Sequence, residues 1–145
     1  MKSAMTFRQL VFLSLLIFVG LQFIPVERTN PPLQAVSIGP QPVMDLFRRS
    51  CFDCHSNETV WPWYGKVAPL SWVVARDVNR GRDKLNFTTW NTLPRQDQDR
   101  LKAEIWKKVK FSEMPPAMYV FGKQNARVTT DHHQMLRAWC GVPPN

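Results

Sequence analysis

The sequence CFDCHSNETVWPWY, residues 51–64, holds two cysteines separated by two residues, with a histidine directly after the second. In an α-helix, Cys51, Cys54 and His55 stand at positions i, i+3 and i+4, which share one face within a turn. This spacing occurs in covalent haem attachment sites, in zinc sites and in redox-active thiol pairs. The other features of the sequence are needed to distinguish these three kinds of site.

We interpret the motif as a covalent haem attachment site. The thiols of Cys51 and Cys54 would bond to the two vinyl groups along one edge of the porphyrin. The imidazole of His55 would then lie under the iron as its proximal ligand. Cys-x-x-Cys-His is the known signature of c-type haem attachment, so the predicted cofactor is one covalent haem c.

Zinc and thiol redox chemistry fit less well. A structural zinc site needs four ligands, and three from one helical turn would crowd a tetrahedron, although Cys140 or the pair His132 and His133 could supply a fourth. A thioredoxin-like thiol pair needs a βαβ context, which the sequence lacks.

The first 26 residues predict a signal anchor or a signal peptide. Lys2 and Arg8 precede an apolar run over residues 10–24, LVFLSLLIFVGLQFI. The run is short for a membrane-spanning helix, which needs about 20 apolar residues, but no small-residue cleavage site follows it. We therefore favour an uncleaved transmembrane anchor, which places the chain in the periplasm, tethered to the bacterial inner membrane.

Composition and charge narrow the class of protein. The chain of 145 residues suits one domain, and three cysteines are too few for a disulfide scaffold. The net charge is +8, and residues 27–145 keep +6 from 17 basic and 11 acidic residues. Because the basic residues are not clustered, nucleic acid is not expected as a partner, whereas a redox protein with an acidic docking surface is.

The pattern along the chain predicts an all-α fold, a small cytochrome c-like helical domain with long loops. Residues 27–41 are rich in proline and read as a tether, and residues 42–145 form the haem c-binding domain. Apolar periodicity predicts helices that begin near Pro42, span residues 71–80 and 94–108, and begin at Thr129 or Thr130. The first of these would carry the cysteine motif near its end, and Gly81 would follow the second.

The sixth position of the iron is assigned to Met114. It lies in SEMPPAMY, directly after the third predicted helix, where Pro115 and Pro116 stiffen the loop that presents the thioether. Met118 is the second choice. A bis-histidine site would use His132 or His133, which fall in the first turn of the last predicted helix.

Several stretches of the chain are similar to one known family. From about residue 40 to residue 140 it resembles the haem-binding domain family of bacterial monohaem c-type cytochromes, through CFDCHSNETVWPWYGKVAPLSW, DVNRGRDKLNF, EMPPAMY and LRAW. The resemblance implies a haem on Cys51 and Cys54 with His55 as proximal ligand. By the general pattern of c-type cytochromes, Met114 would be the distal ligand.

Other residues near the motif have expected roles. Trp61, Trp63 and Tyr64 are predicted to wall the haem, and Asn57 and Thr59 to cap the motif helix or form a turn. Arg80, Arg82 and Lys84 are placed in a loop, where they either pair with haem propionates or face solvent. Cys140 is expected to be buried beside Trp139.

These features together predict an electron carrier rather than an enzyme. The expected function is the transfer of single electrons outside the cytoplasmic membrane. A haem-based redox or gas sensor, or a peroxidase-like enzyme, would need a labile sixth ligand and remains the alternative.

Overall fold

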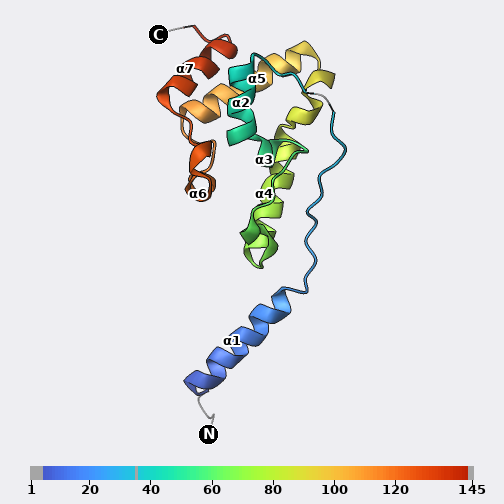
Figure 1. The fold of residues 1–145 in the computed structure, drawn as a ribbon, viewed down its shortest axis with the longest axis vertical. Helices are drawn as coiled ribbons and strands as arrows, with labels where there is room; N and C mark the ends of the chain where they lie inside the picture. The colour runs from blue at the N-terminus through green and yellow to red at the C-terminus, as the bar shows by residue number, and fades with distance from the viewer. Residues whose placement is uncertain (1–4, 35, 144–145) are drawn as a thin grey trace. The chain divides into compact units, whose positions relative to one another are not determined.

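The computed structural model describes residues 5–34 and 36–143, and it divides the chain into two units. The first unit holds residues 1–29 and 61–77, and the second holds residues 30–60 and 78–145. Over the described residues every regular element is a helix and no strand is present, which confirms the all-α prediction (Figure 1).

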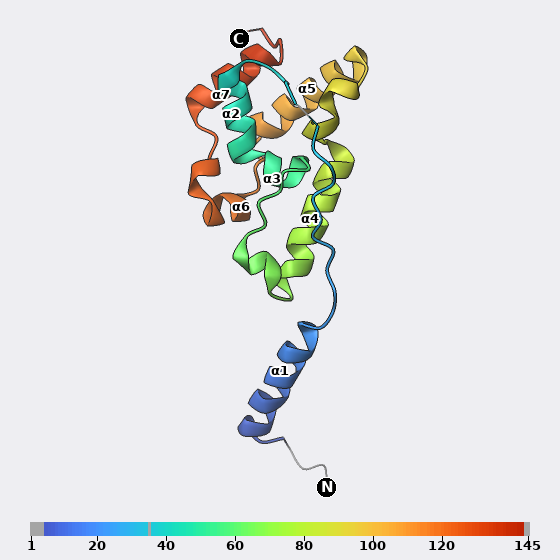
Figure 2. The ribbon, with the colours of Figure 1, turned by 45° about the vertical axis from the view of Figure 1, so that its right-hand side comes forward.

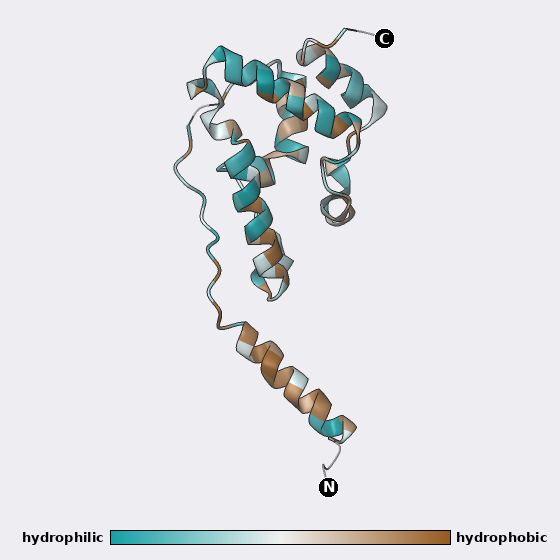
Figure 3. Ribbon diagram, turned by 180° about the vertical axis from the view of Figure 1, so that it is seen from behind, coloured by the Kyte–Doolittle hydropathy of each residue, from teal (hydrophilic) through white to brown (hydrophobic). Residues whose placement is uncertain are grey.

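The first unit contains the N-terminal helix α1 (Phe7–Leu21), the short helix η1 (Trp63–Lys66) and the beginning of α4 (Leu70–Lys84). Thr6 and Gln9 form a capping box at the start of α1. The helix is apolar around its circumference and none of its residues is buried (Figure 3).

The predicted membrane-spanning anchor is not supported. Fifteen residues of α-helix extend about 22 Å, whereas a bilayer core is about 30 Å thick. Among the described residues, no helix combines the length and the apolar character that a membrane crossing requires. The helix ends at Leu21, and the side-chain amide of the next residue, Gln22, exchanges hydrogen bonds with the backbone of Ala68.

The second unit is built around an aromatic core. Phe47 stacks on Phe87 with 4.7 Å between ring centroids and meets Trp139 edge-on at 5.1 Å, while Phe52 also stacks on Phe87, at 5.3 Å. These rings come from α2 (Gln41–Ser50), α3 (Phe52–His55), η2 (Phe87–Thr92) and α7 (Thr130–Trp139). Figure 2 shows α2 beside α3 and α7. Helix α5 (Arg95–Lys110) adds its buried stripe, formed by Leu101, Ile105 and Val109.

Two predicted helices match the structure closely. Helix α5 begins directly after Pro94 and runs two residues beyond its predicted end. Helix α7 begins with Thr129 as its N-cap, where the threonine hydroxyl accepts from the His132 N–H. Gly141 follows the end of α7 at a φ of 72°, in the left-handed region that favours glycine.

The other two predicted helices differ from the structure. The helix that begins near Pro42 does not continue through the motif, because it ends at Ser50 and a separate turn, α3, follows Cys51. Helix α4 does not stop before Gly81 but continues to Lys84. The sequence patterns also missed the short helices α6 (Ala117–Gly122) and η3 (Gln124–Ala126).

Candidate functional site

The two cysteines and the histidine of the motif lie within one helical turn, residues 51–55, here called the Cys-His turn. The carbonyl of Cys51 accepts from the N–H groups of Cys54 at 3.2 Å and of His55 at 2.9 Å. Cys51 itself departs from helical geometry, with φ −127° and ψ −35°, and so separates α3 from α2. The three side chains therefore come from one turn, as predicted, although this turn is a helix of its own.

The His55 imidazole is oriented by the backbone of the segment that ends α4. Its Nδ1 lies 2.9 Å from the carbonyl oxygen of Gly81 and 3.1 Å from that of Leu85. A carbonyl only accepts, so Nδ1 carries the proton and Nε2 keeps its lone pair. Burial lowers the pKa of His55, against the smaller raising effect of these two carbonyls, which favours the neutral ring that an iron ligand requires.

The thiol beside this ring is also neutral. Burial, with a smaller contribution from the neighbouring Cys54, raises the pKa of Cys51 to about 12. At physiological pH its sulfur is therefore protonated.

Gly81 allows α4 to approach the Cys-His turn. A Cβ atom at this position would stand 2.3 Å from the carbonyl oxygen of Cys54 and 3.2 Å from the Cys54 Cβ. No other residue fits such a contact without a backbone shift. Sequence reasoning treated Gly81 as a helix terminator, whereas a lone glycine in an amphipathic pattern can also signal close packing of this kind.

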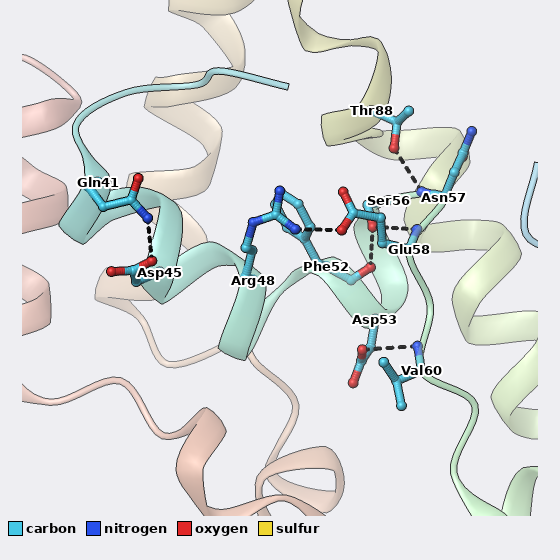
Figure 4. Close-up of polar contacts among 10 residues, drawn as sticks. All are labelled: Gln41, Asp45, Arg48, Phe52, Asp53, Ser56, Asn57, Glu58, Val60 and Thr88. Carbon is cyan, nitrogen blue, oxygen red and sulfur yellow. Dashed lines mark hydrogen bonds and ion pairs between the residues drawn. The ribbon is translucent and has the colours of Figure 1, made fainter. Parts of the chain in front are cut away.

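The residues after the Cys-His turn close it with hydrogen bonds, several of which Figure 4 shows. The hydroxyl of Ser56 donates to the Phe52 carbonyl at 2.8 Å, and that of Thr59 donates to the Asp53 carbonyl at 2.7 Å. The backbone N–H of Asn57 donates to the Thr88 hydroxyl at 2.9 Å. Thr59 thus has the capping role that the sequence predicted, because it engages a carbonyl of the motif helix. Asn57 instead joins the turn to distant parts of the chain, since its side chain also contacts the Pro32 carbonyl and Asn86.

Arg82 holds the same segment from α4. Its guanidinium donates to the carbonyl of Ser56 at 2.8 Å, to the hydroxyl of Thr59 at 2.8 Å and to the side chain of Asn30 at 2.9 Å. Arg80, Arg82 and Lys84 therefore lie on a helix rather than in the predicted loop. Arg80 and Lys84 are exposed, in agreement with the interpretation that they face solvent.

Asp53, between the two cysteines, is a site residue that the sequence analysis missed. Its carboxylate accepts from the Tyr119 hydroxyl and from the Lys123 ammonium group, each at 2.8 Å. Burial and the hydrogen bond to Asp53 raise the pKa of Tyr119 well above its usual range, so the phenol remains a donor. The position of a carboxylate between the two cysteines was the only sequence signal for this role. The two partners of Asp53 could not be predicted, because they lie more than sixty residues away along the chain.

Met114 follows the end of α5 and its side chain is accessible. The residue is 39% exposed, and its N–H donates to the Lys108 carbonyl at 3.2 Å. It lines a cavity of about 150 Å³ together with Val109, Val120 and His133. The assignment of Met114 to the sixth iron position stays a prediction.

The two histidines of α7 are half-buried and already engaged by protein groups. His132 lies 2.9 Å from the guanidinium of Arg49 and forms the capping box with Thr129. The ring of His133 meets the Trp106 ring edge-on, with 6.3 Å between centroids. Both histidines lie in the first turn of the last helix, as predicted, and the use of either one as an iron ligand stays a prediction.

The aromatic residues predicted to wall the haem belong to the first unit, whereas the Cys-His turn belongs to the second. Trp63 is 78% exposed and meets Tyr64 edge-on. The indole N–H of Trp61 is buried and, in the part of the chain that the structure describes, has no acceptor. The pocket role of these three side chains stays a prediction.

Comparison with known protein families identifies the chain. The model of the haem-binding domain family matches residues 16–141, which include the Cys-His turn, α4, Met114 and α7. The chain belongs to the haem-binding domain family. The family resemblance read from the sequence motifs is thereby confirmed, and haem is supported as the ligand of this protein.

No curated protein and no solved structure matches the chain. Within the described residues, no group of three histidine, cysteine or acidic side chains is arranged to hold a metal ion by itself.

Proposed function

We propose that this haem-binding domain is a c-type cytochrome that carries single electrons outside the cytoplasmic membrane. One observation carries the proposal. His55 Nδ1 is engaged by the carbonyls of Gly81 and Leu85, which leaves Nε2 as the free ligand atom in the same turn as the two cysteines. A metal-binding histidine usually has its second nitrogen held in this way.

The residues of the turn fit the group that they would hold. Cys51 and Cys54 would form the two thioether bonds, His55 would bind the iron through Nε2, and Met114 would be the second protein ligand of the iron. The haem would supply a one-electron couple, whose potential methionine opposite histidine raises. Gly81 and Arg82 keep the turn in place, and Trp61, Trp63 and Tyr64 are proposed to shield the haem from water.

The proposed setting is the periplasm, with an acidic redox protein as partner. A thioether-bonded haem suits an exported protein, and the basic net charge of +8 would draw an acidic surface into a brief encounter. No catalytic group is assigned.

One second candidate shares the same motif. A gas or redox sensor, or a peroxidase-like enzyme, would need a sixth ligand that a small molecule can displace. The two functions differ in whether the sixth position exchanges.

The test uses the full chain, produced in a host with the haem c maturation machinery. Haem that stays with the polypeptide under denaturing conditions, and is lost in the Cys51→Ser, Cys54→Ser double variant, is expected. Haem that dissociates from the wild-type chain would overturn the c-type assignment.

Absorption spectra with and without carbon monoxide then address the sixth ligand. An electron carrier is expected to be low-spin, to show a sulfur-to-iron charge-transfer band and to be unmoved by carbon monoxide. Met114→Ala should lose that band, while Met118→Ala, a matched change four residues away, should keep it. Ready carbon monoxide binding by the wild type would favour the sensor or peroxidase-like function instead.

A further inference from the structure

Asp53 sits at the centre of a polar network inside the Cys-His turn. Its side chain is only 12% exposed, and it accepts three hydrogen bonds. One oxygen faces the Val60 N–H at 3.3 Å, and the other faces both the Tyr119 hydroxyl and the Lys123 ammonium at 2.8 Å. A carboxylate this enclosed needs such donors, because an unpaired buried charge is costly.

Both long-range partners of Asp53 belong to one element. Tyr119 lies in α6, and Lys123 is the C-cap of the same helix. None of the α6 residues is buried, and Met118 and Phe121 are 80% and 81% exposed. Helix α6 therefore has little apolar packing, and its two contacts with Asp53 are strong, charge-assisted ones.

The segment that carries Met114 leads directly into this helix. Only Pro115 and Pro116 separate Met114 from the first residue of α6, and each proline restricts the backbone. At its other end the segment is held by α5, where the Lys108 carbonyl accepts from the N–H groups of Glu113 and Met114. The position of Met114 is thus set by α5 on one side and by α6 on the other.

We propose that Asp53 is a positioning residue for the sixth ligand. Through Tyr119 and Lys123 it holds α6 against the Cys-His turn, and α6 in turn holds Met114 where it can bind the iron. This inference rests on the proposed function, since it takes His55 and Met114 as the axial ligands. It adds that the strength of the Met114 bond depends on a carboxylate beside the proximal ligand.

The test compares variants of the full, haem-loaded protein. Tyr119→Phe keeps the ring and removes the O–H donor, Lys123→Gln removes the ion pair, and Lys123→Arg keeps it. Arg100→Gln is the matched control, because it removes one positive charge from exposed pairs with Asp97 and Glu104. The readouts are the sulfur-to-iron band, the rate of carbon monoxide binding to the ferrous protein, and the midpoint of unfolding.

A loosened α6 should open the sixth position without loss of covalent haem. Tyr119→Phe and Lys123→Gln are each expected to weaken the sulfur band and to speed carbon monoxide binding about tenfold, the effect of one charge-assisted hydrogen bond. Lys123→Arg and Arg100→Gln should behave as the wild type. A purely structural role would instead lower the unfolding midpoint and leave the carbon monoxide rate unchanged.

The outcomes separate this inference from the proposed function. Suppose that the wild type shows the sulfur band, and that Tyr119→Phe and Lys123→Gln both match the wild type in band intensity and in carbon monoxide binding rate. The positioning role of Asp53 is then refuted, whereas the assignment of Met114 as iron ligand is kept. If the wild type lacks the band, Met114 is not the ligand and both proposals for it fail. Should one variant not fold, the other still decides, because each removes a different donor.

Discussion

Gly81 is the residue whose replacement tests the packing around the Cys-His turn most directly. On helix propensity alone, Gly81→Ala should stabilise α4 by up to about 1 kcal/mol. The added Cβ would stand 2.3 Å from the Cys54 carbonyl oxygen, so we expect the opposite sign, a loss of about 1–3 kcal/mol. Because the same shift disturbs the Gly81 carbonyl that faces His55, the yield of haem-loaded protein should also fall.

Gly65→Ala is the matched control for this change, measured by urea unfolding and by haem per polypeptide. Its Cβ would meet the nearest atom, Val74 Cγ1, at 3.4 Å, an ordinary contact. An alanine at position 81 that leaves both stability and haem yield unaltered would show that α4 can move away from the turn at no cost.

Cys140 is expected to react slowly with alkylating reagents. Burial raises the pKa of this half-buried thiol to about 11, although Lys102 and a hydrogen bond with the Trp106 backbone lower it slightly. The thiolate is the reactive form, so at pH 8 the rate should be roughly a hundredfold below that of a thiol with the ordinary pKa of 9.0.

The measurement follows iodoacetamide labelling of the folded, haem-loaded protein by mass spectrometry, with Cys140→Ser as the control for other sites. The rate should rise about tenfold per pH unit and level off only near pH 11. A plateau near pH 9 would mean that the thiol is as exposed in solution as an unfolded one.

At the scale of elements, sequence patterns found the helices that bury a regular apolar stripe. Helices α5 and α7 have such stripes together with terminal signals, Pro94 before one and Thr129 before the other. The break at Cys51 was not predictable from periodicity, because the buried face continues from Ser50 to Phe52 across it. Helix α6 was missed because it buries no side chain and so leaves no periodic signal.

The candidate site likewise has a local part that the sequence predicted and a long-range part that it did not. The Cys-His turn is local, so its residues and the capping role of Thr59 could be predicted from their spacing in the sequence. The contacts that orient the site are long-range, such as those of His55 with Gly81 and of Asp53 with Tyr119. No local pattern encodes such partners, because they depend on how α4 and α6 pack in the second unit.

Arg82 carries a prediction at the element scale, because it ties α4 to the segment after the Cys-His turn. Arg82→Lys keeps the charge but cannot reach Ser56, Thr59 and Asn30 together, since an ammonium lacks the planar fork. We expect a loss of about 1–2 kcal/mol in urea unfolding, reduced from the buried value by partial exposure. Arg80→Lys, at an exposed position two residues earlier, should change stability little. Equal losses of stability in the two variants would show that the contacts of Arg82 do not stabilise the packing of α4 against this segment.

At the scale of the whole molecule, charge should govern how fast the protein meets the redox partners that we propose for it. The second unit holds 14 basic and 9 acidic residues, a net charge of +5, and the first unit adds +3. Lys84 is exposed at the end of α4, next to Leu85, whose carbonyl faces His55. Positive charge therefore lies close to the proposed haem, where it attracts anionic reagents at low salt.

The effect of this positive charge can be tested with two small redox reagents, one anionic and one cationic, without a known partner protein. Oxidation of the reduced protein by ferricyanide should slow at least about threefold as salt rises from roughly 10 mM to 150 mM, because screening weakens the attraction. A cationic cobalt(III) complex should show the reverse trend. Lys84→Glu should lower the ferricyanide rate more than Lys107→Glu, which makes the same change of charge on α5. Equal effects of the two variants would mean that net charge alone, and no basic surface near His55, steers the electron acceptor.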